Sequence, residues 1–241
     1  MGGKESVSRN SQNLVRLRPK PLEETLMIIM APSFQILSMP ERSSIVSMIE
    51  LIGRTCYKSA DKMTPDSSGD FVRRLIQSGH HSVLEHVSIT VHFVCDRGVS
   101  HELVRHRLAS YSQESTRYVN YAKEKFGRGL TVIHPCFWPK DSPPYQEWQR
   151  AMEQAERSYL QLIQLGARPE EARSVLPTSV KTEIVMSCNI REWRHVFDLR
   201  CGKASHPQMR EIMLPLLDEF HEKIPVLFDD LYARYLPDIQ A

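Results

Sequence analysis

Two stretches of the chain alternate apolar and polar residues, which is the pattern of a β-strand with one buried face. In VSITVHFVC, positions 87 to 95, the apolar face comprises Val87, Ile89, Val91, Phe93 and Cys95. In SVKTEIVMSC, positions 179 to 188, the better face comprises Val180, Ile184, Met186 and Cys188. We therefore expect both segments to be strands of a sheet.

Other segments repeat apolar residues every three or four positions, as amphipathic helices do. The first follows Pro40, has Ser43 or Ser44 as its expected N-cap, and has an apolar face of Ile45, Met48, Ile49, Ile52 and Cys56. The second stops at Gly79, which suits the position after a helix, and carries Phe71, Val72, Leu75 and Ile76. The third covers positions 142 to 165, and its aromatic residues are expected in the core: Tyr145, Trp148 and Tyr159.

The helical pattern continues toward the C-terminus. Pro169 opens a short helix in which Arg173 lies, and Asn189 is a suitable N-cap for the helix after the second strand. That helix is expected to bury Ile190, Trp193, Val196 and Phe197 and to expose Arg191, Arg194, His195 and Asp198. Positions 208 to 235 are expected to form two helices that break near Pro225.

The organisation of the chain follows from these patterns. Helices and strands interleave without a Gly/Ser-rich linker, so we expect one mixed α/β (α+β) domain at 26–241, with a central sheet flanked by helices. Residues 1–25 are polar and lack the apolar region of a secretory signal, so we expect a flexible N-terminal extension. The MGGKES start also matches a myristoylation pattern, and the Arg and Ser content resembles a transit peptide, which are the alternatives.

Composition narrows the choice of partners. The 241 residues carry a net charge of +2, so no global field favours nucleic acid. No apolar run reaches the roughly 20 residues that span a bilayer. The five cysteines are an odd number without a C-x-x-C pair, which is typical of reduced thiols. We therefore expect a cytoplasmic protein that binds neither nucleic acid nor a membrane.

The sequence RHRLASYSQESTRY, positions 105 to 118, concentrates cationic and hydroxyl side chains. Arg offers phosphate a planar fork of donors and hydroxyls complete the shell, so this stretch suits a phosphorylated small molecule. If it is helical, Arg105 and Arg107 lie about 200° apart and face different partners, while Glu102 shares a face with Arg105. After Leu108 the apolar period is lost, and we expect a loop. A solvated ion-pair network and a kinase target in RHRLAS are the alternatives.

Other chemistries have less support in the sequence. The histidines of GHHSVLEHVSITVH lack the H-E-x-x-H spacing and have no neighbouring cysteine, so no metal site is expected. There is no G-x-S-x-G, and no cysteine is distinguished as a nucleophile. The Gly-rich nucleotide loops G-x-G-x-x-G and G-x-x-x-x-G-K-[ST] are also missing.

Four elements, in order, resemble one family. Arg105-His106-Arg107, seven further residues and then Ser115 resemble the RHR-x7-S signature of the flavin-dependent thymidylate synthases. GHHSVLEH resembles the family's G-H-x-[ST]-x-x-E-H segment, and EEARSVLP resembles its A-R-x-x-L-P element. N-x-R from position 189, with FDLR ending at Arg200, resembles its C-terminal site. The resemblance covers about residues 26 to 235.

The resemblance implies a homotetramer of mixed α/β subunits with active sites shared between chains. It implies an enzyme that moves the methylene of methylenetetrahydrofolate to C5 of dUMP and reduces it with a hydride from FAD, which NADPH renews. The products would be dTMP and tetrahydrofolate. In such an enzyme the cofactor carries the electron chemistry, and the protein supplies alignment and charge.

The resemblance also implies two groups of ligand-binding side chains. The flavin side would comprise His80, Ser82, Arg105, His106, Arg107, Gln113, Asn189, Arg191 and His195. The dUMP side would comprise Glu102, Arg105, Gln113, Glu114, Ser115, Thr116, Arg117, Arg173 and Arg200. No residue is assigned to a metal, and His206 is left without a role.

Arg200 is the expected catalytic residue, because a permanent cation beside the uracil stabilises the charge that makes C5 nucleophilic. Ser115 is assigned to binding, since an unassisted hydroxyl is a poor nucleophile. Three residues differ from some family members: Gln113 replaces Glu, Glu102 replaces Gln and His195 replaces Asn. Each retains hydrogen-bonding capacity, so we expect altered detail and retained activity.

Two other functional classes remain open at this point. A nucleic-acid binder would bind oligonucleotides in a salt-sensitive manner without flavin. A flavin-storage module would bind FAD and fail to turn over dUMP.

Overall fold

The structure, a computed structural model, describes residues 27–123 and 129–240. The strands are β1 (Ile28–Met30), β2 (Ser33–Ser38), β3 (Ser88–Asp96), β4 (Ala109–Gln113), β5 (Thr131–Ile133) and β6 (Lys181–Asn189). The α-helices are α1 (Arg42–Cys56), α2 (Ser68–Gln77), α3 (Arg97–Leu103), α4 (Pro143–Gln164), α5 (Pro169–Ala172), α6 (Ile190–Arg200), α7 (Pro207–Lys223) and α8 (Pro225–Ile239). The short 3-10 helices are η1 (Ala60–Lys62), η2 (His81–His86) and η4 (Arg173–Val175). The expected extension at 1–25 lies outside the described residues and stays a prediction.

Four strands form an antiparallel sheet in the order β2-β3-β6-β4. The two strands expected from alternation, β3 and β6, are its central pair, with Ile89 opposite Cys188. β4 pairs with the other side of β6, from Ala109 opposite Cys188 to Gln113 opposite Ile184. β1 and β5 form a separate parallel pair. β4 therefore joins the RHR segment at one end to the hydroxyl-rich segment at its other end.

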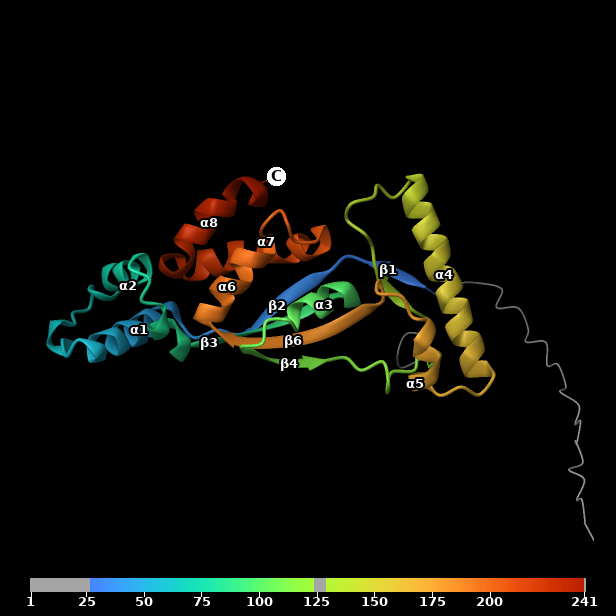
Figure 1. Cartoon of the computed structure of the whole chain (residues 1–241), viewed down its shortest axis with the longest axis horizontal. Helices are drawn as coiled ribbons and strands as arrows, with labels where there is room; N and C mark the ends of the chain where they lie inside the picture. The colour runs from blue at the N-terminus through green and yellow to red at the C-terminus, as the bar shows by residue number, and fades with distance from the viewer. Residues whose placement is uncertain (1–26, 124–128, 241) are drawn as a thin grey trace, which may run out of the picture.

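One face of the sheet is buried under helices. Figure 1 shows α6, α7 and α8 stacked over this face. Ile89, Phe93 and Ile184 point into the core beneath them, while the alternate residues of β3 and β6 are half-buried or exposed. Trp193 of α6 is fully buried, and its Nε1 donates to the carbonyl oxygen of Ile89 at 3.1 Å. The expected mixed α/β class is confirmed, with the helices gathered on one side of the sheet.

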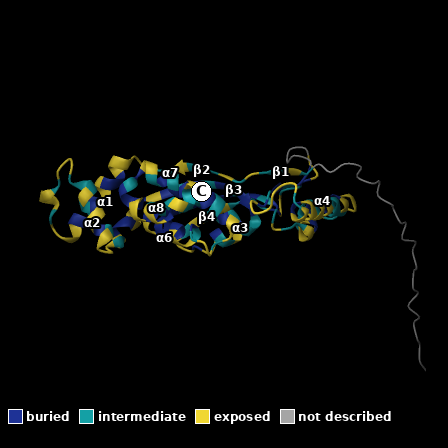
Figure 2. Ribbon diagram, turned by 90° about the horizontal axis from the view of Figure 1, so that it is seen from above, coloured by how far each residue is buried: buried dark blue, intermediate teal, exposed yellow. Residues whose placement is uncertain are grey.

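A second, smaller core lies at the α4 end of the elongated molecule (Figure 2). Its buried residues are Tyr121, Leu130, Val132, Met152, Tyr159, Leu160, Ala172 and Val180. The aromatic residues of α4 pack here as predicted, and Trp148 Nε1 donates to Ser179 Oγ at 3.1 Å. Val180 belongs to this core and Ile184 to the first, so β6 connects the two.

α1 differs from its prediction at its start and on one face. It begins at Arg42, so neither Ser43 nor Ser44 is its N-cap, and that prediction was wrong. Met48 and Cys56 are exposed. The reason is that the buried stripe lies further round the helix, through Ile45, Val46, Ile49, Glu50, Gly53 and Arg54.

The RHR segment also differs from expectation. It is not helical, because α3 ends at Leu103 and the chain then leads directly into β4. The loop expected after Leu108 is a strand, since its backbone pairs with β6. Arg194, expected on the exposed side of α6, is buried and donates to Asp230 Oδ1 at 2.9 Å and to Asp230 Oδ2 at 2.6 Å.

The remaining helix boundaries agree with the sequence. Gly79 and Gly166 follow α2 and α4 with φ angles of +74° and +93°, which favour glycine. Asn189 caps α6, because its Oδ1 accepts from the backbone N–H of Glu192 at 2.9 Å. α7 and α8 are separated just before Pro225 as predicted. In the described part of the chain, no helix combines the length and apolarity needed to cross a membrane.

Candidate active site

A cavity of about 1160 Å³ opens beside α6 and α8, bounded also by η2 and the RHR segment. Pockets for drug-sized ligands are about 300–1,000 Å³, so this cavity suits a larger molecule. Its lining includes these residues expected at the site: Arg105, His106, Arg107, Asn189, Arg191, His195 and Arg200. The structure thus brings most of the predicted flavin side together with the predicted catalytic arginine.

Backbone contacts fix the shape of the RHR segment. The N–H of Arg105 donates to the carbonyl of Glu102 at 3.2 Å, and the N–H of His106 donates to that of Leu103 at 3.0 Å. The Tyr111 hydroxyl lies 2.6 Å from the Leu103 carbonyl oxygen and 2.7 Å from that of His106, so it ties the segment to β4. As a result, His106 points inward and is buried, while both arginines of the segment are exposed.

Arg200 ends α6, and one edge of its guanidinium is held by fixed acceptors. Its Nε donates to His106 Nε2 at 3.0 Å. Its Nη1 donates to Glu102 Oε2 at 2.6 Å, and its Nη2 donates to the Glu102 carbonyl at 3.0 Å. A guanidinium has five N–H donors. These contacts use three of them and leave two for a ligand in the cavity.

His106 connects Arg200 with a second carboxylate. Its Nδ1 lies 3.3 Å from Glu192 Oε1, and both side chains are buried. Burial lowers the pKa of His106, and the positive charge of Arg200 lowers it further, while Glu192 acts in the opposite direction. Since the ordinary pKa of histidine is about 6.5, His106 is neutral at pH 7.

His106, Glu192 and His195 have potential metal-ligand atoms within 4.8 Å of one another. The surrounding charge opposes a cation there, because Arg200 donates to the same imidazole and Arg191 and Arg194 line the same cavity. The group therefore fits a hydrogen-bond relay better than a metal centre.

The start of α6 shapes the other wall of the cavity. Asn189 uses its side-chain oxygen to cap the helix, and Arg191 forms an ion pair with Glu85 of η2. His195 lies one turn further along, exposed, with its ring centroid 5.7 Å from that of His106. Two expected flavin-side residues, His80 and Ser82, are exposed next to this wall and do not line the cavity.

The residues at the C-terminal end of β4 lie apart from Arg200. Gln113 turns into the fold, where its Nε2 donates to Ser100 Oγ at 2.9 Å and to Thr182 Oγ1 at 3.2 Å. Glu114 accepts from Lys181 Nζ at 3.0 Å. Gln113 and Glu114 both line a second cavity of about 550 Å³.

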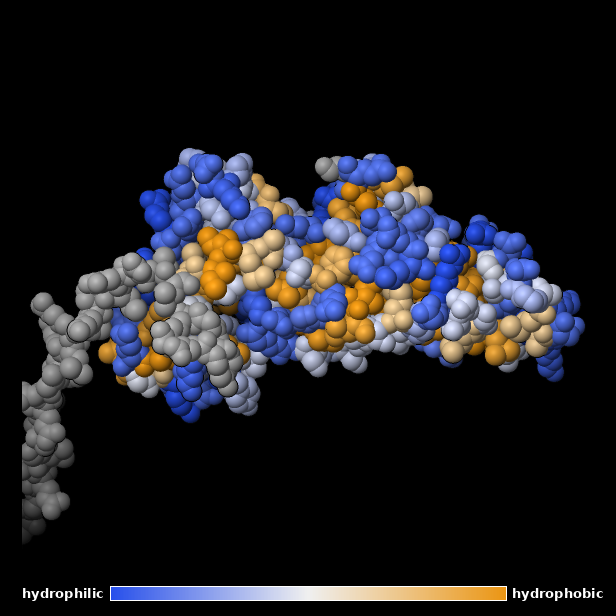
Figure 3. All heavy atoms as spheres, turned by 180° about the vertical axis from the view of Figure 1, so that it is seen from behind, coloured by the Kyte–Doolittle hydropathy of each residue, from blue (hydrophilic) through white to orange (hydrophobic). Residues whose placement is uncertain are grey.

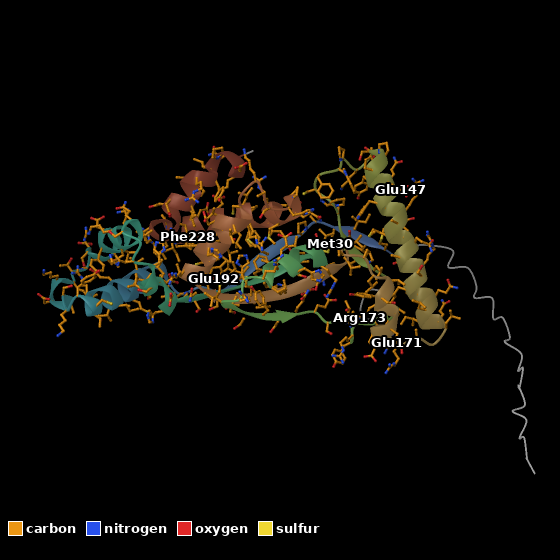
Figure 4. All side chains as sticks on the ribbon, in the orientation of Figure 1. Met30, Glu147, Glu171, Arg173, Glu192 and Phe228 are labelled. Atoms are coloured by element: carbon orange, nitrogen blue, oxygen red, sulfur yellow. The ribbon has the colours of Figure 1, made fainter. Side chains whose placement is uncertain are left out.

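The remaining members of the expected dUMP side form a group beyond this second cavity. Arg173 of η4 is exposed, and its Nη1 donates to Thr116 Oγ1 at 3.4 Å. Ser115 Oγ accepts from the backbone N–H of Arg117 at 3.3 Å. Figure 4 shows Arg173 and Glu192 toward opposite ends of the sheet. A single chain therefore does not bring the Ser115–Arg173 group to Arg200.

Sequence reasoning missed several residues of the large cavity. Glu85 lies inside the GHHSVLEH motif, so the motif itself could have pointed to it. Glu192 follows the N-x-R motif directly, and a carboxylate next to a cationic cluster was a usable signal. Asp230 and Arg234 reach the cavity from α8, and no sequence motif marks them.

The thiols are unsuited to covalent catalysis. All five cysteines are free. Burial raises the pKa of Cys95 and of Cys201 to about 12, so both stay protonated at neutral pH. The thiolate is the nucleophilic form, which leaves these side chains inert.

Comparison with known proteins agrees with the arrangement of the cavity. A family model described as thymidylate synthase complementing protein matches residues 41–226. The flavin-dependent thymidylate synthase of Pyrococcus furiosus is 32% identical over 178 residues, which cover 73% of this chain and 72% of that protein. The Geobacter sulfurreducens protein of the same name is 33% identical over 189 residues, covering 76% and 80%.

A solved structure has the same fold. The UMP/dUMP methylase PolB of Streptomyces cacaoi, in a crystal structure with 5-Br dUMP, superposes with a TM-score of 0.70 over 86% of this chain and 97% of that chain. At 22% identity this likeness shows the fold alone. The family model and the relatives together cover most of the sequence. The chain therefore belongs to the thymidylate synthase complementing proteins, the family of the flavin-dependent thymidylate synthases.

Proposed function

We propose that this protein makes dTMP from dUMP, with methylenetetrahydrofolate as one-carbon donor, FAD as hydride source and NADPH as reductant. The observation that carries the proposal is Arg200, whose guanidinium is fixed by Glu102 and His106 at the wall of a large cavity. A fixed cation with two remaining donors matches the negative charge that develops on an ionised uracil ring.

The large cavity suits FAD in size and lining. Three exposed arginines on its wall provide forked donors for a pyrophosphate: Arg105, Arg107 and Arg191. Leu108 and Leu199 are exposed beside them and offer apolar surface to a flat ring. A bound FAD supplies the hydride that reduces the transferred one-carbon unit, and NADPH renews it.

The protein's own part in the reaction is electrostatic. Arg200 keeps its positive charge at every physiological pH, so it stabilises negative charge on the pyrimidine without a proton transfer. The fixed position of the guanidinium means that little reorganisation accompanies the charge build-up. C5 of dUMP then attacks the one-carbon unit directly, and no enzyme nucleophile is needed. This agrees with the protonated state of Cys95 and Cys201.

The working unit in this proposal is a homotetramer whose sites combine residues of two chains. The five residues of β4 alone span about 17 Å, which keeps Arg200 apart from the Ser115–Arg173 group of the same chain. A second copy is needed to bring such a group to Arg200. Large apolar side chains are exposed, as Figure 3 illustrates for one side, and assembly would cover them: Leu37, Met48, Leu51, Leu108 and Leu199.

We place the reaction in the cytoplasm. Five free cysteines in one chain fit a reducing compartment, where disulfides are rare.

The proposal is tested by following the visible band of bound FAD under anaerobic conditions. The protein, replete with FAD, is mixed with NADPH with and without dUMP. We expect NADPH to bleach the band and dUMP to change the rate, because both ligands meet beside Arg200. Formation of dTMP on adding methylenetetrahydrofolate completes the test and separates an enzyme from a flavin-storage module. Failure to bind FAD, or bleaching indifferent to dUMP without dTMP formation, would refute the proposal.

Arg173→Ala is expected to weaken dUMP binding by about ten-fold to a hundred-fold, the effect of one lost hydrogen bond to a charged group. Arg173 is exposed next to Thr116, so its removal leaves no buried group unpaired. Equilibrium binding of dUMP measures the change, and FAD affinity is the internal control. An unchanged dissociation constant for dUMP would remove Arg173 from the substrate site.

A further inference from the structure

Glu192 is a buried carboxylate at the wall of the large cavity, only 6% exposed. A buried ionised carboxylate is unfavourable unless it is paired or hydrogen-bonded. Its position on α6 follows from the Asn189 cap, which fixes the first turn through the backbone N–H of Glu192. The carboxylate then faces His106, with Oε1 3.3 Å from Nδ1.

The donor pattern determines which nitrogen of His106 carries the proton. The Nε of an arginine can only donate, and it lies 3.0 Å from His106 Nε2, so Nε2 must accept. A neutral imidazole has one N–H, which is then on Nδ1 and points at Glu192. Glu192 therefore stabilises the tautomer that Arg200 requires.

The other tautomer would disrupt Arg200. With its proton on Nε2, His106 would direct an N–H at the N–H of Arg200, and the two donors would repel each other. The guanidinium would lose one of its fixed contacts and keep only those to Glu102. Its two ligand-facing donors would then no longer have a fixed direction.

We propose that Glu192 is a positioning residue: its carboxylate holds His106 in the Nδ1–H tautomer, and His106 in turn orients Arg200 toward the pyrimidine. The effect on turnover rests on the proposed function, whereas the tautomer of His106 does not. The two can therefore be tested separately.

The first experiment uses the wild-type protein. Nitrogen NMR of histidine-labelled protein at pH 7 reports the protonation of each ring nitrogen, and the His106 signals are identified by their loss in His106→Asn. We expect a protonated Nδ1 and an unprotonated Nε2. The opposite tautomer, or a ring protonated on both nitrogens, would overturn the proposal without any Glu192 variant.

The second experiment compares Glu192→Ala with Glu192→Gln. We expect Glu192→Ala to lower kcat for dTMP formation by about ten-fold to a hundred-fold, as for loss of one charge-assisted hydrogen bond, with KM for dUMP and FAD affinity changed less than about three-fold. The NMR signals of His106 should lose the Nδ1–H pattern. Glu192→Gln should restore most of the rate, because its amide oxygen can accept the same proton.

Glu156→Gln is the matched control, because Glu156 is equally buried in the second core and its Oε1 accepts from the backbone N–H of Leu130 at 2.9 Å. It should leave kcat unchanged. An unchanged kcat in Glu192→Ala, or an equal loss in Glu192→Ala and Glu192→Gln with unaltered His106 signals, would contradict the positioning role. If added Zn²⁺ shifts the His106 and His195 signals together in wild type and not in Glu192→Ala, the group is a metal site instead. If wild type shows the expected tautomer but forms no dTMP, the proposed function fails and the tautomer assignment stands.

Discussion

Replacing Arg200 with alanine is expected to abolish dTMP formation, with kcat/KM lowered by at least about 10³-fold, while FAD still binds. Loss of one preorganised donor to a developing negative charge typically lowers the rate by about 10²–10³-fold, and this variant removes two donors and a full charge. FAD should still bind, because Arg105, Arg107 and Arg191 provide the other cations of the cavity wall. Steady-state dTMP formation and a titration with FAD give the two readouts.

Arg200→Lys is the matched control for this variant. It keeps a positive charge but loses the planar fork, so it cannot contact His106 and Glu102 together as Arg200 does. We expect activity between that of wild type and that of Arg200→Ala. Undiminished turnover by Arg200→Ala would remove Arg200 from the reaction, and loss of FAD along with activity would make it a cofactor-binding residue.

Two inactive variants are expected to restore each other's activity when they assemble together. Arg200→Ala lacks the catalytic cation, and Arg173→Glu places a negative charge where the dUMP phosphate is expected. If each site takes Arg200 from one chain and Arg173 from another, random assembly of equal amounts repairs about a quarter of the sites, since each wild-type residue is present with a probability of one half. Differently tagged variants, co-expressed and purified through both tags, give the mixed assembly.

The assay is run at dUMP concentrations well below the KM of Arg173→Glu, where each parent alone should be inactive. The control is the double variant Arg173→Glu/Arg200→Ala assembled with Arg200→Ala, which contains no Arg200 and should stay inactive. Mixed assemblies without restored activity would show that both residues act within one chain, and a chain that stays monomeric would refute the homotetramer directly.

Much of the fold was predictable, because burial on one side gives a clear period. β3 and β6 followed from alternation alone, and α4 followed from its aromatic residues and Gly166. β4 was not predictable in this way. Its outward side carries Ser110 and Ser112, so it lacks the usual apolar signal and is a strand because β6 offers it hydrogen bonds. Pairing between distant segments is not written into a local pattern.

The site was predictable where its residues lie within motifs and not where they converge from elsewhere. The cluster of Arg105, His106 and Arg200 was expected from the family resemblance, and the structure brings the three together. Their connection was not expected: the sequence suggested Glu102 as a partner for Arg105, whereas it holds Arg200. The chain bends away after α3, which separates the faces of Glu102 and Arg105 that a continuous helix would share.

The anchoring of Arg200 also has an entropic consequence. A free arginine side chain loses up to about 2 kcal/mol of rotamer freedom when it is immobilised. Here Glu102 and His106 immobilise it as the chain folds, and its side chain is only 17% exposed. The ordering penalty is therefore a term in the folding equilibrium and not in the encounter with dUMP. Substrate meets a guanidinium whose conformational search is already complete.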